Sequence, residues 1–453
     1  MSPYMMKILR GKDVRRMARR AERAFASTPA DQIPKINQPQ TPPQPSIKRG
    51  MVSAAQADYL PNAYEAFKTQ DYSSFKPSII VPKFWDGVSL QPPETYQIDC
   101  SHLDMTKSPE EVPELTNRMK RLFQETGAVL LTNTGLTRET KHAMEKWAHV
   151  LMPSTMKYEG GANSRDTLNV NLTNVYETGA PLSAYLHYHH EMAYVKESVD
   201  RLCFMAVDVP EDEHEPLRGA SYLSDNIKVT DYLLQTEMGK KLKEHGICYV
   251  RCLTDREGLS GKQLSWKDIE SGKAQGTPIY NHWQDSFGVT SQAEAEKLAA
   301  RKGLRVDWGE NRYMKTRFYV SGFEYFPQAD KNLLYSSIAD HGAWFDTWPG
   351  MEQLPDMDGF ANANESQKPL LITYGNDELI TQEDLKIYTD AYDKFGFPVG
   401  GLNGWRNGDI ATFCNYRFAH GRPGINLLEG QNREIGVMLG PMYTRVGCRK
   451  DRW

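Results

Sequence analysis

Three histidines and a carboxylate lie within one short stretch of the chain. The segment 185–194 reads YLHYHHEMAY and contains His187, His189, His190 and Glu191. If this segment is a strand, side chains two residues apart point to the same face. His187, His189 and Glu191 would then share one face, so a histidine and the glutamate could bind one ion together. Imidazole and carboxylate groups bind several first-row transition metals. The spacing therefore predicts a metal site and leaves the identity of the metal open.

A third ligand is expected from a distant part of the chain. His420 lies in the sequence FAHGR, after a predicted strand, and Gly421 beside it permits close approach of the backbone. Two histidines and one carboxylate on one side of an ion leave three positions open on the other. That arrangement suits Fe(II), which must also bind a cosubstrate and oxygen. We therefore predict a facial triad of His189, Glu191 and His420.

Arg433 is a candidate for binding an acidic cosubstrate. It precedes the β-like run 435–439, and its guanidinium can make a bidentate pair with a carboxylate. The residues alone leave other interpretations open. The cluster could bind zinc, His187 could replace His189 as the ligand, and His420 could belong to a surface turn.

The elements that must position these residues are mainly short strands. A helix is expected to begin after Ser108, with Pro109 in its first turn and Glu111 as the capping-box partner, and to end at Gly127 before a buried strand over 128–131. Further strands are expected at 249–253, 304–308, 317–320, 370–374 and 409–414, and helices at 294–302 and 381–395. This pattern predicts a mainly β fold with surrounding helices and a double-stranded β-helix (jelly roll) core.

Composition narrows the class of protein. The 453 residues are 40% hydrophobic and 25% charged, with a net charge of -4. We therefore expect no nucleic-acid or membrane partner. The six cysteines form no CxxC pair, which favours reduced thiols in an intracellular protein.

The first part of the chain differs from the rest. Residues 1–92 are expected to form an N-terminal extension, basic at first and then rich in Pro and Gln between about 30 and 45, and partly disordered. Residues 93–453 would form the catalytic domain. A cytoplasmic location is expected, or an organellar one if the arginine-rich start is a transit peptide.

From about Tyr96 to Leu439 the chain resembles the TauD/TfdA family of Fe(II)/2-oxoglutarate oxygenases, also called clavaminate synthase-like. The run HHEMAY from His189 resembles the family's HNEMAY motif, which favours His189 over His187 as the ligand. The sequences WRNGD at 405–409 and HGR from His420 resemble the turn and motif around the last ligand. The order of these matches along the chain is more specific than any one of them.

The resemblance also implies a cosubstrate site. The sequence RGASYLSD at 218–225 resembles the family's GGET-x-L-x-D stretch, with Ser221 in place of the usual threonine. Arg433 would bind the distal carboxylate of 2-oxoglutarate, with a hydrogen bond from Ser221. Val437 stands where many members carry a second arginine. His190 replaces a common asparagine.

The resemblance implies an enzyme that uses Fe(II), 2-oxoglutarate and O2 to oxidise a C–H bond of a small amino-acid-like or carboxylate substrate. Hydroxylation, desaturation and oxidative cyclisation are all open, including kainoid-type ring closure in secondary metabolism. A zinc-dependent hydrolase and a catalytically silent jelly-roll binding protein are the alternatives. The oligomeric state is left open. Candidate substrate contacts are Arg422, His190, Tyr185, Tyr176, Arg165 and His187.

Overall fold

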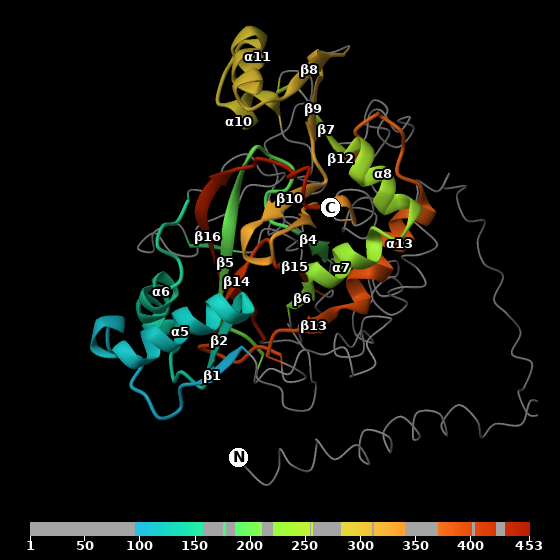
Figure 1. Ribbon diagram of the computed structural model, residues 1–453. Coiled ribbons are helices and arrows are strands. Elements are labelled where there is room, and N and C mark those ends of the chain that lie inside the picture. The colour runs from blue at the N-terminus through green and yellow to red at the C-terminus, as the bar shows by residue number, and fades with distance from the viewer. Residues whose placement is uncertain are drawn as a thin grey trace, which may run out of the picture. The chain divides into compact units, whose positions relative to one another are not determined.

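The computed structural model describes most of the chain from Tyr96 onward. The described residues are 96–156, 175–177, 186–210, 221–253, 255–256, 282–309, 312–339, 370–400, 404–422 and 431–453. The expected extension over 1–92 lies outside them. The described part is rich in strands with helices around them, as the sequence predicts (Figure 1).

A six-stranded sheet forms the larger of two facing layers. Its order is β1 (Gln97–Asp99), β2 (Ala128–Thr132), β14 (Ile410–Cys414), β5 (Glu197–Asp208), β16 (Glu434–Thr444) and β3 (Tyr176–Glu177). Side chains alternate across β5. Phe204 packs in one apolar cluster together with Val437, whereas Cys203 and Met205 pack in another on the opposite face. Both faces of this sheet are therefore covered.

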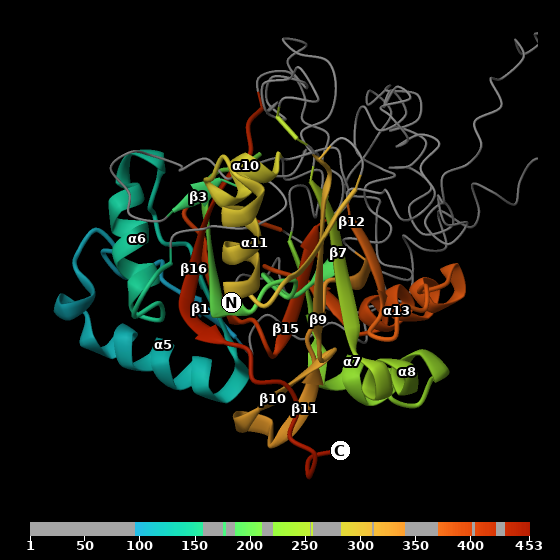
Figure 2. The same ribbon diagram turned by 90° about the horizontal axis from the view of Figure 1, so that it is seen from above.

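Helices α5 (Pro113–Thr126) and α6 (Lys141–His149) cover the outer face of the large sheet (Figure 2). α5 ends at Gly127, as expected, where φ is +76°. Its start differs from the prediction. Ser108 caps a short 3-10 turn, Pro109–Glu111, and α5 begins only at Pro113. A second proline, which has no backbone N–H to donate, opens a new helix there.

The smaller layer is a four-stranded sheet. Its order is β13 (Gly396–Pro398), β6 (Tyr222–Asp225), β15 (Phe418–Arg422) and β4 (Leu186–His189). Its outer face packs against α7 (Asn226–Leu233), α8 (Glu237–His245) and α13 (Gln382–Lys394), through a cluster that includes Tyr188 and Tyr222. Figure 2 shows the two helical groups on opposite sides of the strands. The layers therefore run helix, sheet, sheet, helix.

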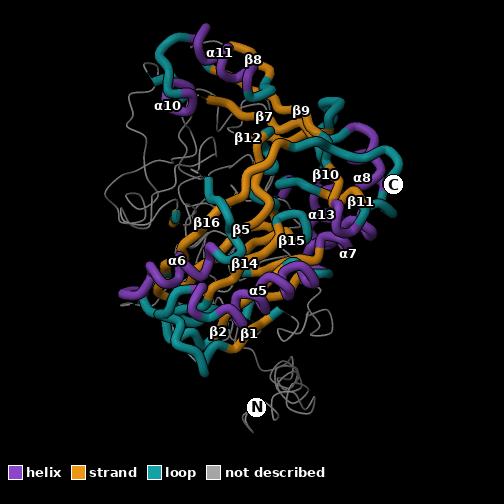
Figure 3. The backbone as a smooth tube through the Cα atoms, turned by 60° about the vertical axis from the view of Figure 1, so that its left-hand side comes forward, coloured by secondary structure: helices purple, strands orange, loops and turns teal. Residues whose placement is uncertain are grey.

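A third sheet lies beside these layers (Figure 3). Its order is β12 (Leu370–Tyr374), β7 (Ile247–Leu253), β9 (Met314–Val320) and β8 (Arg305–Trp308), with α10 (Trp283–Phe287) and α11 (Gln292–Arg301) next to it. A hairpin of β10 (Phe323–Phe326) and β11 (Lys331–Leu334) completes the strands. Two more short 3-10 turns are Arg138–Thr140 and Pro327–Ala329. The strands and helices expected at 249–253, 304–308, 317–320, 370–374, 409–414, 294–302 and 381–395 are all confirmed.

The cysteines and the lengths of the helices agree with the composition of the chain. All six cysteines are free thiols, so the absence of a disulfide framework is confirmed. Among the described residues, no helix is both long enough and apolar enough to cross a membrane.

A β-bulge separates His187 from the face that carries His189. β15 pairs with β4 so that His420 faces His189, but two residues further along, Arg422 faces Leu186 rather than His187. The extra residue in β4 is accommodated against Gly421, whose backbone lies on the bulged segment. The simple alternation that would place His187 and His189 on one face is therefore wrong, because the strand is irregular between them.

Gly421→Ala is expected to destabilise the protein. An added Cβ would lie 2.5 Å from the carbonyl oxygen of Leu186 and 3.1 Å from the backbone nitrogen of Tyr188, and neither atom can move as a side chain would. Overpacking of this kind costs about 1–3 kcal/mol of unfolding free energy, measurable by urea denaturation. Gly309→Ala is the control, since its nearest contact would be an ordinary 3.5 Å to Tyr313 Cβ. Equal stabilities of the two variants would contradict this account.

Candidate metal centre

Three side chains from two strands and a turn converge between the two facing sheets. His189, Glu191 and His420 each offer one ligand atom, and these atoms lie within 4.8 Å of one another. Nε2 of His420 is 3.8 Å from a carboxylate oxygen of Glu191, and the two imidazole rings are 4.2 Å apart at their centroids. All three residues are buried. The structure therefore brings together the three residues that the sequence predicts as a triad.

The ring of His189 is oriented by its own strand. Its Nδ1 lies 2.8 Å from the carbonyl oxygen of His187, and a carbonyl only accepts hydrogen bonds. Nδ1 must therefore carry the hydrogen, which leaves the lone pair of Nε2 for an ion. Such a bond from the second ring nitrogen is the usual support of a metal-binding histidine.

His420 is held by the strands on both sides of it and by two aromatic rings. Across the small sheet it pairs with His189 of β4 and with Leu223 of β6. Phe204 of β5 and Phe413 of β14 each pack 5.6 Å from its ring, centroid to centroid. The large sheet therefore supplies the apolar wall, and the small sheet supplies the histidines.

Glu191 lies in a turn just after β4, and its backbone is held by hydrogen bonds to Asn415. The Glu191 N–H donates to Asn415 Oδ1 at 3.0 Å, and Asn415 Nδ2 donates back to the Glu191 carbonyl at 3.0 Å. Ser198 and Tyr335 donate to the same carbonyl from their hydroxyls, each at 3.1 Å. These three supporting residues are fully buried. The position of the carboxylate is therefore fixed through its backbone.

A buried ion pair holds the end of the same turn. Arg445 Nε donates to Glu324 Oε1 at 2.8 Å, and Arg445 also donates to the carbonyl oxygens of Ala193 and Ser321. Glu324 accepts a further bond from the Gly447 N–H at 2.7 Å. Both charges are compensated by hydrogen bonds, as a buried pair requires. The C-terminal segment thus contacts the turn only two residues beyond Glu191.

The other two histidines of the cluster point elsewhere. His187 lines a small cleft with Tyr388 and Asp393 of α13. The ring of His190 lies 4.9 Å from that of Tyr335, and its Nδ1 accepts a hydrogen bond from the Ser336 N–H at 3.2 Å. Burial lowers the pKa of each imidazole to about 3. Neither is brought into the triad, so their expected contact with substrate gains no support.

The residues expected to bind 2-oxoglutarate are buried near one end of the facing sheets. Ser221 directly precedes β6, and its hydroxyl accepts a hydrogen bond from Trp405 Nε1 at 3.2 Å. Arg433 directly precedes β16. Its burial and the neighbouring charge of Arg422 hold the pKa of its guanidinium well below the usual range. Two buried cations side by side make this region favourable for an anion.

Three expected substrate contacts are not tested by the described side chains. Tyr176 contributes its backbone to β3, and Tyr185 and Arg165 lie outside the described residues.

The donor set fits Fe(II). Two neutral imidazoles and a carboxylate are placed on one side of a common point, and the second ring nitrogen of His189 is already satisfied. This is the ligand set of non-haem iron oxygenases. Sequence reasoning missed Asn415, Tyr335 and Arg445, which position the turn. The signal from Asn415 is weak, since an asparagine after a strand is also an ordinary turn residue.

Asn415→Asp is expected to weaken Fe(II) binding roughly 10- to 100-fold, as loss of a supporting contact commonly does. The variant loses the donor to the Glu191 carbonyl and places a carboxylate against it. Metal affinity is measured by titration well below the melting temperature, with circular dichroism to verify folding. Asn376→Asp is the control, because Asn376 supports only an exposed turn at Glu378. A folded Asn415→Asp protein with unchanged affinity would contradict the positioning role.

Comparisons with known proteins identify the family. The family model "Taurine catabolism dioxygenase TauD, TfdA family" matches residues 91–317, just over half of the chain. A clavaminate synthase-like protein of Arabidopsis thaliana is 22% identical over 259 residues, covering 56% of this chain and 71% of that protein.

The solved structures that this chain is similar to share little sequence identity with it. A taurine dioxygenase from Burkholderia xenovorans is 11% identical, with a TM-score of 0.41, over 79% of this chain and 89% of that one. AAD-2 in complex with Mn(II) and N-oxalylglycine is 12% identical, with a TM-score of 0.38, over 79% and 96%. On the family match, this chain belongs to the TauD/TfdA family and is a dioxygenase that depends on Fe(II), 2-oxoglutarate and O2.

Proposed function

We propose that His189, Glu191 and His420 bind the catalytic Fe(II), and that the enzyme oxidises a C–H bond of a small amino-acid-like or carboxylate substrate. The observation that carries this proposal is the convergence of the three ligand atoms within 4.8 Å in a buried site of a TauD/TfdA family member. A zinc hydrolase with the same ligands would not require an arginine pair for an acidic cosubstrate.

We further infer that the two facing sheets form the double-stranded β-helix core expected from the sequence. In support, their strands are antiparallel except for β1 with β2, and the inner faces meet in one apolar cluster that contains Phe204 and Leu223. A closed apolar interior of this kind keeps water from the reacting groups.

The protein's own groups would bind and orient the cosubstrate. Arg433 would pair with the distal carboxylate of 2-oxoglutarate, and its charge would be compensated there. Ser221 would add a hydrogen bond, because its hydroxyl already accepts from Trp405 and keeps its own hydrogen to donate. When bound, the iron supplies activation of oxygen for attack on an unactivated C–H bond.

The reaction outcome depends on how the substrate is held. The carboxylate at Glu191 disfavours halogenation, since it occupies the position that a halide would need. Hydroxylation, desaturation and oxidative cyclisation remain within the proposal, and kainoid-type ring closure in secondary metabolism is one such cyclisation. Val437 stands where many family members carry a second arginine, so binding of the cosubstrate carboxylate would rest on Arg433.

Glu191→Ala and His420→Ala are expected to abolish succinate formation while the protein stays folded. Each variant removes one of three iron ligands. Succinate is measured after purified protein, loaded anaerobically with Fe(II), receives oxygen and 2-oxoglutarate. Glu237→Ala and His245→Ala, on the distant helix α8, are the matched controls. Retained iron-dependent turnover in either ligand variant would overturn the assignment.

Arg433→Gln is expected to raise the KM for 2-oxoglutarate roughly 10- to 100-fold, because loss of a charged hydrogen-bonding partner costs about 1.5–3 kcal/mol. Fe(II) affinity should stay within a factor of about two, since Arg433 is not among the converging ligands. Steady-state kinetics and metal titration separate the two quantities. Arg449→Gln, which removes a surface pair with Asp451 and a contact over the Tyr325 ring, is the control. An unchanged KM would exclude Arg433 from the cosubstrate site.

A further inference from the structure

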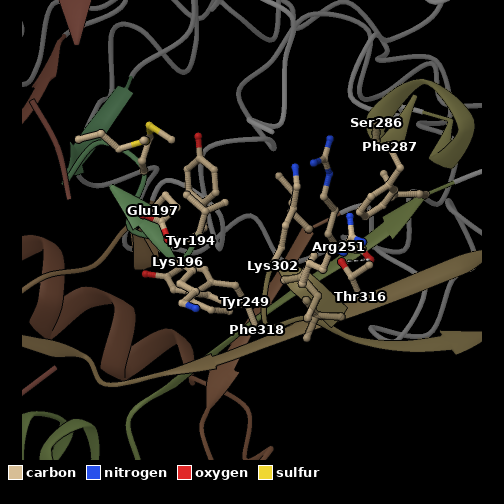
Figure 4. Close-up of a pocket in the computed structure, with 18 of the residues that line it drawn as sticks. Tyr194, Lys196, Glu197, Tyr249, Arg251, Ser286, Phe287, Lys302, Thr316 and Phe318 are labelled. Atoms are coloured by element: carbon tan, nitrogen blue, oxygen red, sulfur yellow. Dashed lines mark hydrogen bonds between the residues drawn. The ribbon is translucent and has the colours of Figure 1, made fainter. Parts of the chain in front are cut away.

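A large pocket opens beside the turn that carries Glu191. Its volume is about 670 Å³, within the range of small-molecule sites. One side is formed by the turn and the start of β5, including Tyr194, Lys196 and Glu197. The other is formed by the third sheet with α10 and α11, including Arg251 and Lys302 (Figure 4).

The pocket adjoins the proposed iron site, because one of its lining residues is the neighbour of Glu191 in the sequence. Met192 directly follows Glu191, has a φ of +59°, and lines the pocket. Met192 also packs in the same apolar cluster as Leu223, which pairs with His420 across the sheet. Tyr194 meets Tyr249 of β7 edge to face, with ring centroids 6.4 Å apart. Met192 therefore belongs both to the pocket wall and to the apolar cluster that contains Leu223, the strand partner of His420.

The order of contacts along β5 places the pocket on a definite side of the metal. At one end, Asp208 pairs with Glu434, next to Arg433. In the middle, Phe204 packs on His420. Nearer the other end, the side-chain amide of Asn415 donates hydrogen bonds to the carbonyl oxygens of both Val199 and Glu191. Glu197, at the start of the strand, lines the pocket. The cosubstrate arginine and the pocket thus lie on opposite sides of the triad.

The wall of the pocket combines an apolar surface with cations. One face of the third sheet presents Tyr249, Arg251 and Leu253 from β7 beside Thr316 and Phe318 from β9. Arg251 is the charged residue in this row, and it pairs across strands with Thr316 and with Leu370 of β12. Most of the rest of the face is aliphatic or aromatic. An arginine in such a surface favours a ligand with both an anionic group and an apolar body.

Three further cations line the pocket. Arg301 and Lys302, at the end of α11, line the side of Arg251, and Lys196 lines the opposite side. Among the described lining residues the carboxylate is Glu197, which accepts a hydrogen bond from the Thr444 hydroxyl at 2.8 Å. Among the described lining residues, the four cations thus outnumber the single carboxylate, which favours an anionic ligand.

We propose that this pocket binds the substrate, that the substrate is an amphipathic carboxylic acid, and that Arg251 with Lys302 binds its carboxylate while the aromatic and aliphatic side chains hold its apolar part. This inference rests on the proposed oxygenase function, since it makes the pocket the substrate side of that metal centre.

The first experiment measures binding of octanoate, a simple amphipathic carboxylate, to the metal-free full-length protein by titration calorimetry. Octanamide, which has the same shape without the charge, is compared with it. We expect saturable octanoate binding, weakened about 10-fold or more by Arg251→Gln and less by Lys302→Gln. Arg305→Gln is the matched control, because its guanidinium stacks on Tyr319 on the opposite face of the same sheet. No binding to the wild type, equal binding of octanamide, or equal loss in the control would overturn the proposal.

The second experiment tests proximity to the metal without requiring turnover. Mn(II), added in place of iron, should broaden the proton NMR signals of octanoate bound to the wild type. The same ligand bound to His420→Ala should keep sharp signals and unchanged affinity. Binding without broadening would show a pocket remote from the metal and would overturn its role as the substrate site. Because neither readout is succinate formation, failure here is distinguishable from failure of the oxygenase assignment.

Discussion

The metal site depends on how the backbone of Glu191 is held. A carboxylate outside a regular strand can serve as a metal ligand only if its backbone is fixed by other parts of the chain. Asn415, which directly follows β14 of the large sheet, binds both the backbone N–H and the backbone carbonyl of Glu191. Tyr335 adds a bond from a segment far away in sequence. Since these groups are buried, loss of one partner leaves the others unsatisfied, so the turn has one stable arrangement.

The same site brings positive charge into the interior. Arg422 and Arg433 are both buried, and the charge of one lowers the pKa of the other. Holding two cations together in a region of low dielectric constant is unfavourable, and a carboxylate between or beside them offsets this cost. The fold can tolerate such a region because its stability comes from the apolar clusters around it, in which His420 is packed between Phe204 and Phe413. Stability and anion binding are thus supplied by different side chains.

Local sequence patterns predicted most strands and the pairing of His189 with Glu191, because both depend on spacings of a few residues. The helix start was misjudged since Ser108 has all the features of a cap, but the second proline at Pro113 divides the segment into a 3-10 turn and a helix. The position of His187 was misjudged for a similar reason. A bulge depends on how β4 pairs with β15, and pairing is a tertiary property that Gly421 alone does not reveal. Asn415 and Arg445 act over more than two hundred residues of separation and have no local signal.

The pocket beside the triad could not be predicted from the sequence either, because it too depends on how strands pair. Arg251 lies in a strand of mixed residues, and only its pairing with Thr316 and Leu370 decides that it shares a face with Tyr249 and Phe318. The third sheet contributes none of the three converging ligands. The iron and cosubstrate side of the site and the pocket side are therefore built from separate elements that meet at the turn after Glu191. Changes in the third sheet could then alter which molecule is bound while leaving the geometry of the ligands intact, which is how one fold comes to serve different substrates.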